Sequence, residues 1–142
     1  MIVPDLNLLV YAYNRDAPDH EAARAWWESA MNGARPVGLP WAVILGYIRL
    51  TTGRAVFLEP FHPDEALTHV RTWLARPQVL VVQPGPRHLD LLAELMRSGP
   101  ASGPQTTDVH LAALAIEFQA ELCSNDADFG RFPGLRWTNP LR

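Results

Sequence analysis

The stretch MIVPDLNLLVYAY (residues 1–13) decides how the rest of the chain is interpreted. The apolar pair Ile2 and Val3 predicts a short strand that ends at Asp5. The apolar residues that follow have helical spacing, which predicts that a helix begins at once. An acid between a strand and a helix lies at the sheet edge where α/β folds place their ligands. This stretch therefore predicts both an α/β fold and a site.

Strand and helix patterns alternate along the remaining residues. Further strands are expected at residues 37–39, 78–82 and 121–124, with a fifth at 135–138. Helices are expected after Asp19, Pro40, Pro63, Pro86 and Thr106 or Thr107, and a loop over residues 98–105. The alternation predicts a central, mainly parallel sheet of four to five strands with helices on both faces. We expect a single three-layer α/β/α domain over residues 1–142.

Composition narrows the classes of protein that the chain could represent. The 142 residues carry a net charge of −3, and all 12 basic residues are arginine. The acid excess argues against non-specific nucleic-acid binding, although it leaves room for a local groove lined by arginine. No apolar run approaches the roughly 20 residues of a membrane span, and the first residues do not read as a signal peptide. The single cysteine, Cys123, excludes an internal disulfide. These features predict a cytoplasmic protein with no membrane partner.

Four aspartates are predicted to meet at one edge of the sheet. Asp5 follows the first strand, Asp126 follows the strand at residues 121–124, and Asp128 lies two residues further on. Asp108 opens the helix that precedes Asp126. One stripe of that helix has an apolar middle with small alanines, so it should pack on the sheet and turn Asp108 towards the domain. The stripe continues from Asp108 through Leu111, Ala112, Ala115 and Gln119.

Gathered carboxylates repel one another unless a cation neutralises them. Oxygen ligands without companion cysteine or clustered histidine favour Mg²⁺, with Mn²⁺ as a substitute, over zinc. Such a cation suits hydrolysis of phosphodiester bonds. Each acid also has a simpler interpretation: Asp5 as a helix N-cap, Asp108 as a partner of a helix dipole, and Asp126 with Asp128 as a polar turn.

Three motifs resemble the PIN domain family. They are PDLNLLVYA (residues 4–12), TDVHLAALA (107–115) and SNDADFGRFPGLRW (124–137). The chain is most similar to the VapC toxins of bacterial toxin–antitoxin pairs, particularly those of mycobacteria. HEAARAWWE (20–28) and LPWAVILGYIRLTT (39–52) extend the likeness to nearly the whole chain.

The resemblance implies a Mg²⁺-dependent endoribonuclease that uses a metal-activated water and cleaves RNA when released from its antitoxin. Asp5 and Asp108 match metal ligands of the family, and Asp126 matches an acid that holds the metal directly or through water. Asp128 matches a supporting acid.

Two further pairs of residues are candidates for the same site. Asn7 and Ser124 match small polar residues that order the site in the family. Arg49 and Arg54 are candidates for contact with RNA phosphates.

The resemblance also implies partners. A groove should receive the C-terminal segment of a VapB-type antitoxin, other helices should form a homodimer, and DNA should be contacted only through the antitoxin. Phe57 and Phe61 are expected to be exposed and to help line a groove. Trp41 and one of the pair Trp26 and Trp27 are expected in the core.

One position departs from the family pattern. Many members carry a glutamate where this chain has Gly46. Gly46 could permit close helix packing, or its presence could leave a catalytically weak or silent domain that binds RNA or a protein. A phosphatase of the haloacid dehalogenase type is a further rival, but it would need an acid at position 7, which is Asn7, and the chain has no lysine.

Overall fold

The central sheet has five parallel strands. The computed structural model describes residues 1–98 and 105–142, so the loop predicted over 98–105 lies almost wholly outside the described residues. Neighbouring strands pair in the order β3-β2-β1-β4-β5, and each of the four pairings is parallel. The strands are β1 (Ile2–Pro4), β2 (Val37–Pro40), β3 (Val79–Val82), β4 (Glu121–Cys123) and β5 (Arg136–Thr138).

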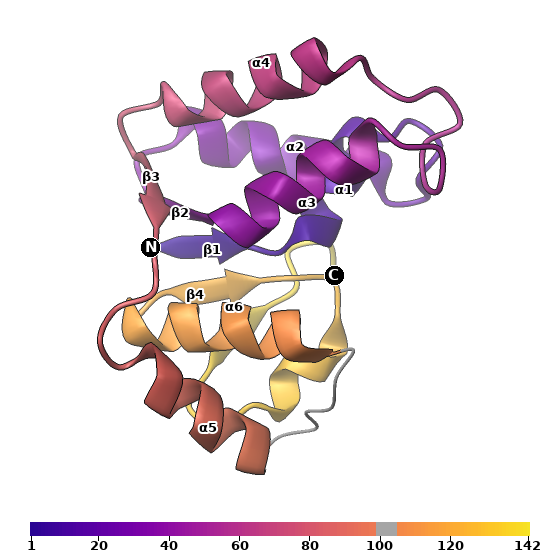
Figure 1. Cartoon of the computed structure of the whole chain (residues 1–142). Coiled ribbons are helices and arrows are strands. Elements are labelled where there is room, and N and C mark those ends of the chain that lie inside the picture. The colour runs from indigo at the N-terminus through magenta and orange to yellow at the C-terminus, as the bar shows by residue number, and fades with distance from the viewer. Residues whose placement is uncertain (99–104) are drawn as a thin grey trace.

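Helices cover the sheet on both faces. They are α1 (Leu6–Tyr13), α2 (His20–Asn32), α3 (Trp41–Thr51), α4 (Pro63–Leu74), α5 (His88–Ser98) and α6 (Thr106–Glu117), followed by the 3₁₀ helix η2 (Ala127–Arg131). The connections from β1 to β2 and from β2 to β3 cross the sheet in one direction, whereas the connection from β3 to β4 crosses it in the other. Since parallel crossovers are right-handed, α1 to α4 and α5 to α6 belong to opposite faces. Figure 1 shows these two groups on either side of the strands.

The predicted three-layer α/β/α architecture is confirmed, with corrections at helix ends. Helix α6 ends at Glu117, so Gln119 does not extend its stripe; Gln119 is exposed and has a φ of 52°. The N-cap position of α6 is Gln105 rather than Thr106 or Thr107. Asp19 occupies the N-cap position of α2, but its carboxylate accepts hydrogen bonds from Arg142 instead of capping the helix. Among the described helices, none has the length and apolar character needed to cross a membrane.

Two expectations for aromatic residues are wrong. Trp41 is 49% exposed, because the buried face of α3 runs through Val43, Ile44 and Tyr47 and Trp41 points away from it. Phe57 is only 4% exposed, and its ring packs edge-on against Phe61.

Of the neighbouring tryptophans, Trp27 is the core residue that was expected, and Trp26 is half-buried. Trp27 packs edge-on against Trp73 at the centre of the α2–α4 side. The surroundings of Cys123 are apolar, and burial raises the pKa of its thiol to about 12. Cys123 is therefore a packing residue.

Candidate active site

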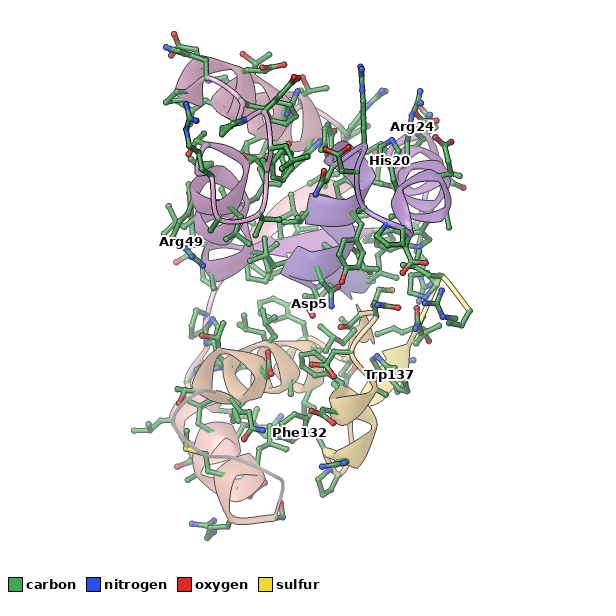
Figure 2. All side chains as sticks on the ribbon, turned by 90° about the vertical axis from the view of Figure 1, so that its right-hand side faces the viewer. Asp5, His20, Arg24, Arg49, Phe132 and Trp137 are labelled. Atoms are coloured by element: carbon green, nitrogen blue, oxygen red, sulfur yellow. The ribbon has the colours of Figure 1, made fainter. Side chains whose placement is uncertain are left out.

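Four aspartates lie at the carboxyl ends of β1 and β4, and we call them the acid edge: Asp5, Asp108, Asp126 and Asp128. Because β1 and β4 are parallel neighbours, the residues that follow them leave the sheet at the same edge. This is also where the strand order changes direction, the usual place for ligands in such sheets. Asp108 comes from the first turn of α6 and Asp128 from η2. Figure 2 looks onto this edge, with Asp5 between the α3 and α6 sides.

Asp5 is buried and is held by two hydrogen bonds. Its Oδ1 accepts from the backbone N–H of Leu6 at 2.7 Å, and its Oδ2 accepts from the Ser124 hydroxyl at 2.7 Å. The first bond makes Asp5 the N-cap of α1, so the capping interpretation is also correct. Burial raises the pKa of Asp5, and the charge of Asp126 adds to that effect, while the two hydrogen bonds oppose it. Each carboxylate oxygen still has lone-pair capacity for a cation.

Asp108 carries the clearest electrostatic signature of the acid edge. Its pKa is raised to about 6, first by burial and then by the charges of Asp5, Asp126 and Asp128. The four carboxylates therefore lie within electrostatic reach of one another. Their mutual repulsion is the condition that a bound cation would relieve.

Asp126 and Asp128 belong to one tight turn. Asp126 Oδ1 accepts from the backbone N–H of Asp128 at 2.9 Å and so caps η2. Asp126 is half-buried, whereas Asp128 is exposed and its Oδ1 lies 3.7 Å from the guanidinium of Arg131. The sequence predictions did not include Arg131, although its spacing of three residues from Asp128 is a signal that could have found it.

Ser124 joins the two strands of the acid edge. Its hydroxyl is fully buried, donates to Asp5 Oδ2, and accepts from the backbone N–H of Asp126 at 3.0 Å and from Asn7 Nδ2 at 3.3 Å. One donor and two acceptor positions are thus all used. The two residues predicted to order the site, Asn7 and Ser124, contact each other, and Ser124 also contacts Asp5 and Asp126.

The donor set fits a hard divalent cation in its chemistry and charge. It consists of carboxylates with neutral Asn7 and Ser124 beside them, which is the ligand type that Mg²⁺ and Mn²⁺ prefer. In the described part of the chain, however, no three acid, histidine or cysteine side chains converge as they do in a ready-made cation site. Asp5 and Asp126 are the acids that Ser124 joins by hydrogen bonds.

Gly46 is a packing residue. It is buried in α3, and a Cβ at this position would lie 2.5 Å from Leu6 Cδ2 in α1. Leu6 therefore occupies the space that a side chain at position 46 would need. A carboxylate cannot be accommodated there unless Leu6 moves, so the acid edge is completed without an acid from α3.

The arginines predicted to contact RNA, Arg49 and Arg54, are both exposed. Figure 2 shows Arg49 on the flank of α3, away from Asp5. Arg54 is exposed in the turn after α3. Within residues 1–98 and 105–142, neither arginine pairs with an acid, whereas Arg131 does.

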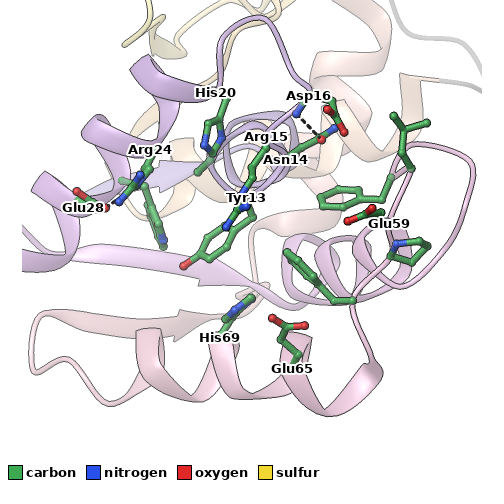
Figure 3. Close-up of a pocket in the computed structure, with 16 residues that line it drawn as sticks. Tyr13, Asn14, Arg15, Asp16, His20, Arg24, Glu28, Glu59, Glu65 and His69 are labelled. Carbon is green, nitrogen blue, oxygen red and sulfur yellow. Dashed lines mark hydrogen bonds and ion pairs between the residues drawn. The ribbon is translucent and has the colours of Figure 1, made fainter.

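A separate groove lies between the α1–α2 connection and the segment that leads into α4. It has a volume of about 830 Å³, and Figure 3 shows the side chains that line it. Its aromatic lining consists of Tyr13, Trp27, Phe57 and Phe61, with His69 beside them, so the prediction that Phe57 and Phe61 line a groove is confirmed. Four basic and four acidic side chains surround it: Arg15, His20, Arg24, His69, Asp16, Glu28, Glu59 and Glu65.

Comparison with known proteins identifies the family. Residues 2–135 match the PIN domain. The chain belongs to the PIN domain family. It is 43% identical over 142 residues to Ribonuclease VapC33 of Mycobacterium tuberculosis, covering 100% of this chain and 99% of that protein. It is 39% identical over 140 residues to Ribonuclease VapC37 of the same species, covering 99% and 97%.

Solved structures share the fold of this PIN domain. VapBC-1 from nontypeable Haemophilus influenzae superposes with a TM-score of 0.70 at 16% identity over the full length of both chains. A DNA-bound VapBC from Salmonella typhimurium gives a TM-score of 0.67 at 20% identity, over 98% of this chain and 97% of that one. The VapC-type PIN domain expected from the sequence is thereby confirmed.

Proposed function

We propose that this PIN domain is a Mg²⁺-dependent endoribonuclease and the toxin of a toxin–antitoxin pair. The observation that carries the proposal is the placement of Asp5 and Asp126 at the ends of the paired strands β1 and β4, where Ser124 joins them, and the raised pKa of Asp108 agrees with it. Relatives named ribonucleases, 39–43% identical over nearly the whole chain, support RNA as the substrate.

The acids have distinct roles in this proposal. Asp5 and Asp108 hold the cation, and Asp126 binds it directly or through water. Asp128 is exposed and supports the site from its edge. It forms an ion pair with Arg131, whose guanidinium can also attract a phosphate. Bound Mg²⁺ would lower the pKa of an attacking water and would place positive charge beside the scissile phosphate. Ser124 and Asn7 keep Asp5 and Asp126 oriented while substrate binds.

Cleavage of RNA by the purified protein tests this function. Wild-type protein should cleave RNA with Mg²⁺ or Mn²⁺, and EDTA should stop the reaction. Asp5→Asn and Asp108→Asn should reduce cleavage to background and relieve growth arrest on expression. Asp90→Asn removes an exposed acid of α5 and is the matched control, so it should cleave like wild type. Cleavage by both active-site variants at the wild-type rate would refute the assignment.

The groove beside α1, α2 and α4 is the surface proposed for the VapB-type antitoxin. Solved VapBC complexes with the same fold support a partner of this kind. The groove is lined by aromatic side chains and by side chains of both charges. Such a lining suits a peptide segment with apolar anchors and charged flanks. Phe61→Ala together with Glu65→Arg should weaken antitoxin binding in a calorimetric titration, whereas RNA cleavage by the free toxin should persist.

A homodimer is proposed through the exposed apolar side chains of α3. Trp41 and Leu45 are 49% and 60% exposed and lie one turn apart. Leu45→Glu should shift the protein from dimer to monomer in analytical ultracentrifugation. A wild-type protein that sediments as a monomer would exclude this interface.

The rival function is a silent PIN domain that only binds RNA or a protein. The packing of Leu6 against Gly46 favours it, because position 46 supplies no acid where the family resemblance leads us to expect a glutamate. This rival predicts that wild-type protein and Asp5→Asn bind RNA equally and that neither cleaves it. The cleavage experiment therefore separates the two functions.

A further inference from the structure

The end of β5 and the residues that follow it contact the acid edge. The Trp137 indole N–H donates to the Ser124 carbonyl oxygen at 3.1 Å, and the Ser124 N–H donates to the Thr138 carbonyl oxygen at 3.0 Å. Asn139 Nδ2 donates to Asn125 Oδ1 at 3.1 Å. Residues 137–139 therefore hold the backbone N–H and carbonyl groups of Ser124 and the side chain of Asn125.

The Asn139–Asn125 bond continues into the acids. The backbone N–H of Asn125 points at Asn7 Oδ1, 3.5 Å away, and Asn7 Nδ2 donates to the Ser124 hydroxyl. Ser124 then donates to Asp5 Oδ2 and accepts from the backbone N–H of Asp126. A continuous set of polar contacts thus runs from Asn139 to Asp5 and Asp126, the two acids that Ser124 ties together.

Asn139 is itself fixed in place. Its Oδ1 accepts from the backbone N–H of Leu141 at 3.0 Å, which closes a local turn and directs Nδ2 towards Asn125. The next residue, Arg142, forms two hydrogen bonds with the Asp19 carboxylate at 3.1 and 3.3 Å. Residues 139–142 therefore span from the acid edge to the start of α2.

We propose that Asn139 is a positioning residue for catalysis, which acts through Asn125 to hold Asp5 and Asp126 in the arrangement that binds the cation. The proposal rests on the nuclease function proposed above. Asn139 is not expected to touch RNA or metal. Polar groups that orient metal ligands typically change metal affinity or activity by about 10- to 100-fold when removed.

A double-mutant cycle tests whether Asn139 acts through Asn125. Asn139→Ala should lower kcat and weaken Mn²⁺ binding by about tenfold, with the KM for RNA changed less than about twofold. Asn125→Ala should have a similar effect, and the double variant should be no worse than the poorer single variant. Losses that multiply in the double variant would overturn the proposal.

Two further variants separate positioning from simple stability. Asn139→Asp keeps the acceptor for the Leu141 N–H but loses the donor to Asn125, so it should lose kcat as Asn139→Ala does. Asn32→Ala removes an exposed asparagine at the end of α2 and is the matched control, which should match wild type in kcat, Mn²⁺ affinity and melting temperature. If Asn139→Ala loses kcat while Asn139→Asp keeps the wild-type rate, only the hydrogen bond to the Leu141 N–H matters. That result would overturn the proposal.

Amide hydrogen exchange gives a readout that does not require activity. Asn139→Ala should speed exchange at Asn125 and Asp126, whose N–H groups point at Asn7 and Ser124, and Asn32→Ala should not. If wild-type protein fails to cleave RNA but the exchange result holds, the nuclease function fails and the positioning contact stands. If wild-type protein cleaves RNA and Asn139→Ala leaves both exchange and kcat unchanged, the positioning role fails and the nuclease function stands.

Discussion

Two polar regions of this molecule differ in whether their polar groups are paired with complementary partners. In the aromatic cluster of Tyr13, Tyr47, His69 and Trp73, donors meet acceptors: Trp73 Nε1 donates to Tyr13 Oη at 2.9 Å, and Tyr47 Oη lies 2.7 Å from His69 Nδ1. At the acid edge, carboxylates gather near one another, and the pKa of Asp108 rises to about 6 as a result. The cluster contributes stability, whereas the acid edge costs stability in the absence of a cation.

The largest expected effect comes from breaking the aromatic cluster. Trp73 is 1% exposed and packs against both Trp27 and Tyr47. Trp73→Ala should lower the free energy of unfolding by about 3–5 kcal/mol, since it leaves a cavity and an unpaired Tyr13 hydroxyl. Trp26→Ala, at a half-buried position, is the control and should cost about 1 kcal/mol. Equal losses in urea denaturation would contradict the assignment of Trp73 to the core.

Adding a cation should reverse the cost at the acid edge. At about 100 times its dissociation constant, a ligand of the native state alone raises the free energy of unfolding by about 2.7 kcal/mol. Mn²⁺ should therefore raise the melting temperature of wild-type protein, and Asp5→Asn should lose most of that increase. The same increase in both proteins would place the cation elsewhere.

Removing one charge should stabilise the acid edge without any cation. The pKa of Asp108 in the folded protein is about 6, above its ordinary value of 3.8, so this group stabilises the fold below about pH 4 and the contribution is lost as pH rises through 6. The whole shift would amount to about 3 kcal/mol, and solvent screening of this half-exposed group reduces the expected value to about 1 kcal/mol. In EDTA at pH 8, Asp108→Asn should thus unfold at higher urea than wild type. A variant less stable than wild type at pH 8 would contradict this reasoning.

The smallest expected effect concerns the contact between α1 and α3. Gly46→Ala gains about 1 kcal/mol of helix propensity, but its Cβ would require Leu6 to move. Overpacking typically costs about 1–3 kcal/mol, and the flexible end of Leu6 keeps the cost at the low end. The net change in free energy of unfolding should be within about 1 kcal/mol, measured by thermal denaturation. Unchanged Mn²⁺ affinity would confirm that position 46 serves packing.

Local sequence was sufficient for the strands and for the placement of Asp5 and Asp126 at one sheet edge. Short apolar runs followed by an acid mark β1 and β4, and parallel pairing brings Asp5 and Asp126 to one edge. Contacts between distant residues could not be predicted in this way. The bond between Asn125 and Asn139 depends on the pairing of β4 with β5, and the contact between Leu6 and Gly46 depends on how two helices cross.

The exposure of single aromatic residues also could not be predicted from the local sequence pattern. Trp41 begins a helix whose buried face starts two residues later, so its side chain turns outward. Phe57 lies in an irregular segment without periodicity, where it is buried and its ring contacts that of Phe61. In both cases, the deciding contact is made by tertiary structure rather than by composition.

The hydrogen bond between Asp5 and Ser124 has a consequence for how the protein is made. These residues lie 119 positions apart in the chain. Contacts across such separations form late, because the loop between them must close first. A nascent chain that has not yet emerged as far as β4 carries Asp5 without Ser124 or Asp126 beside it. In that state, it cannot assemble the acid edge, so the nuclease activity proposed above would begin only after β4 has been synthesised.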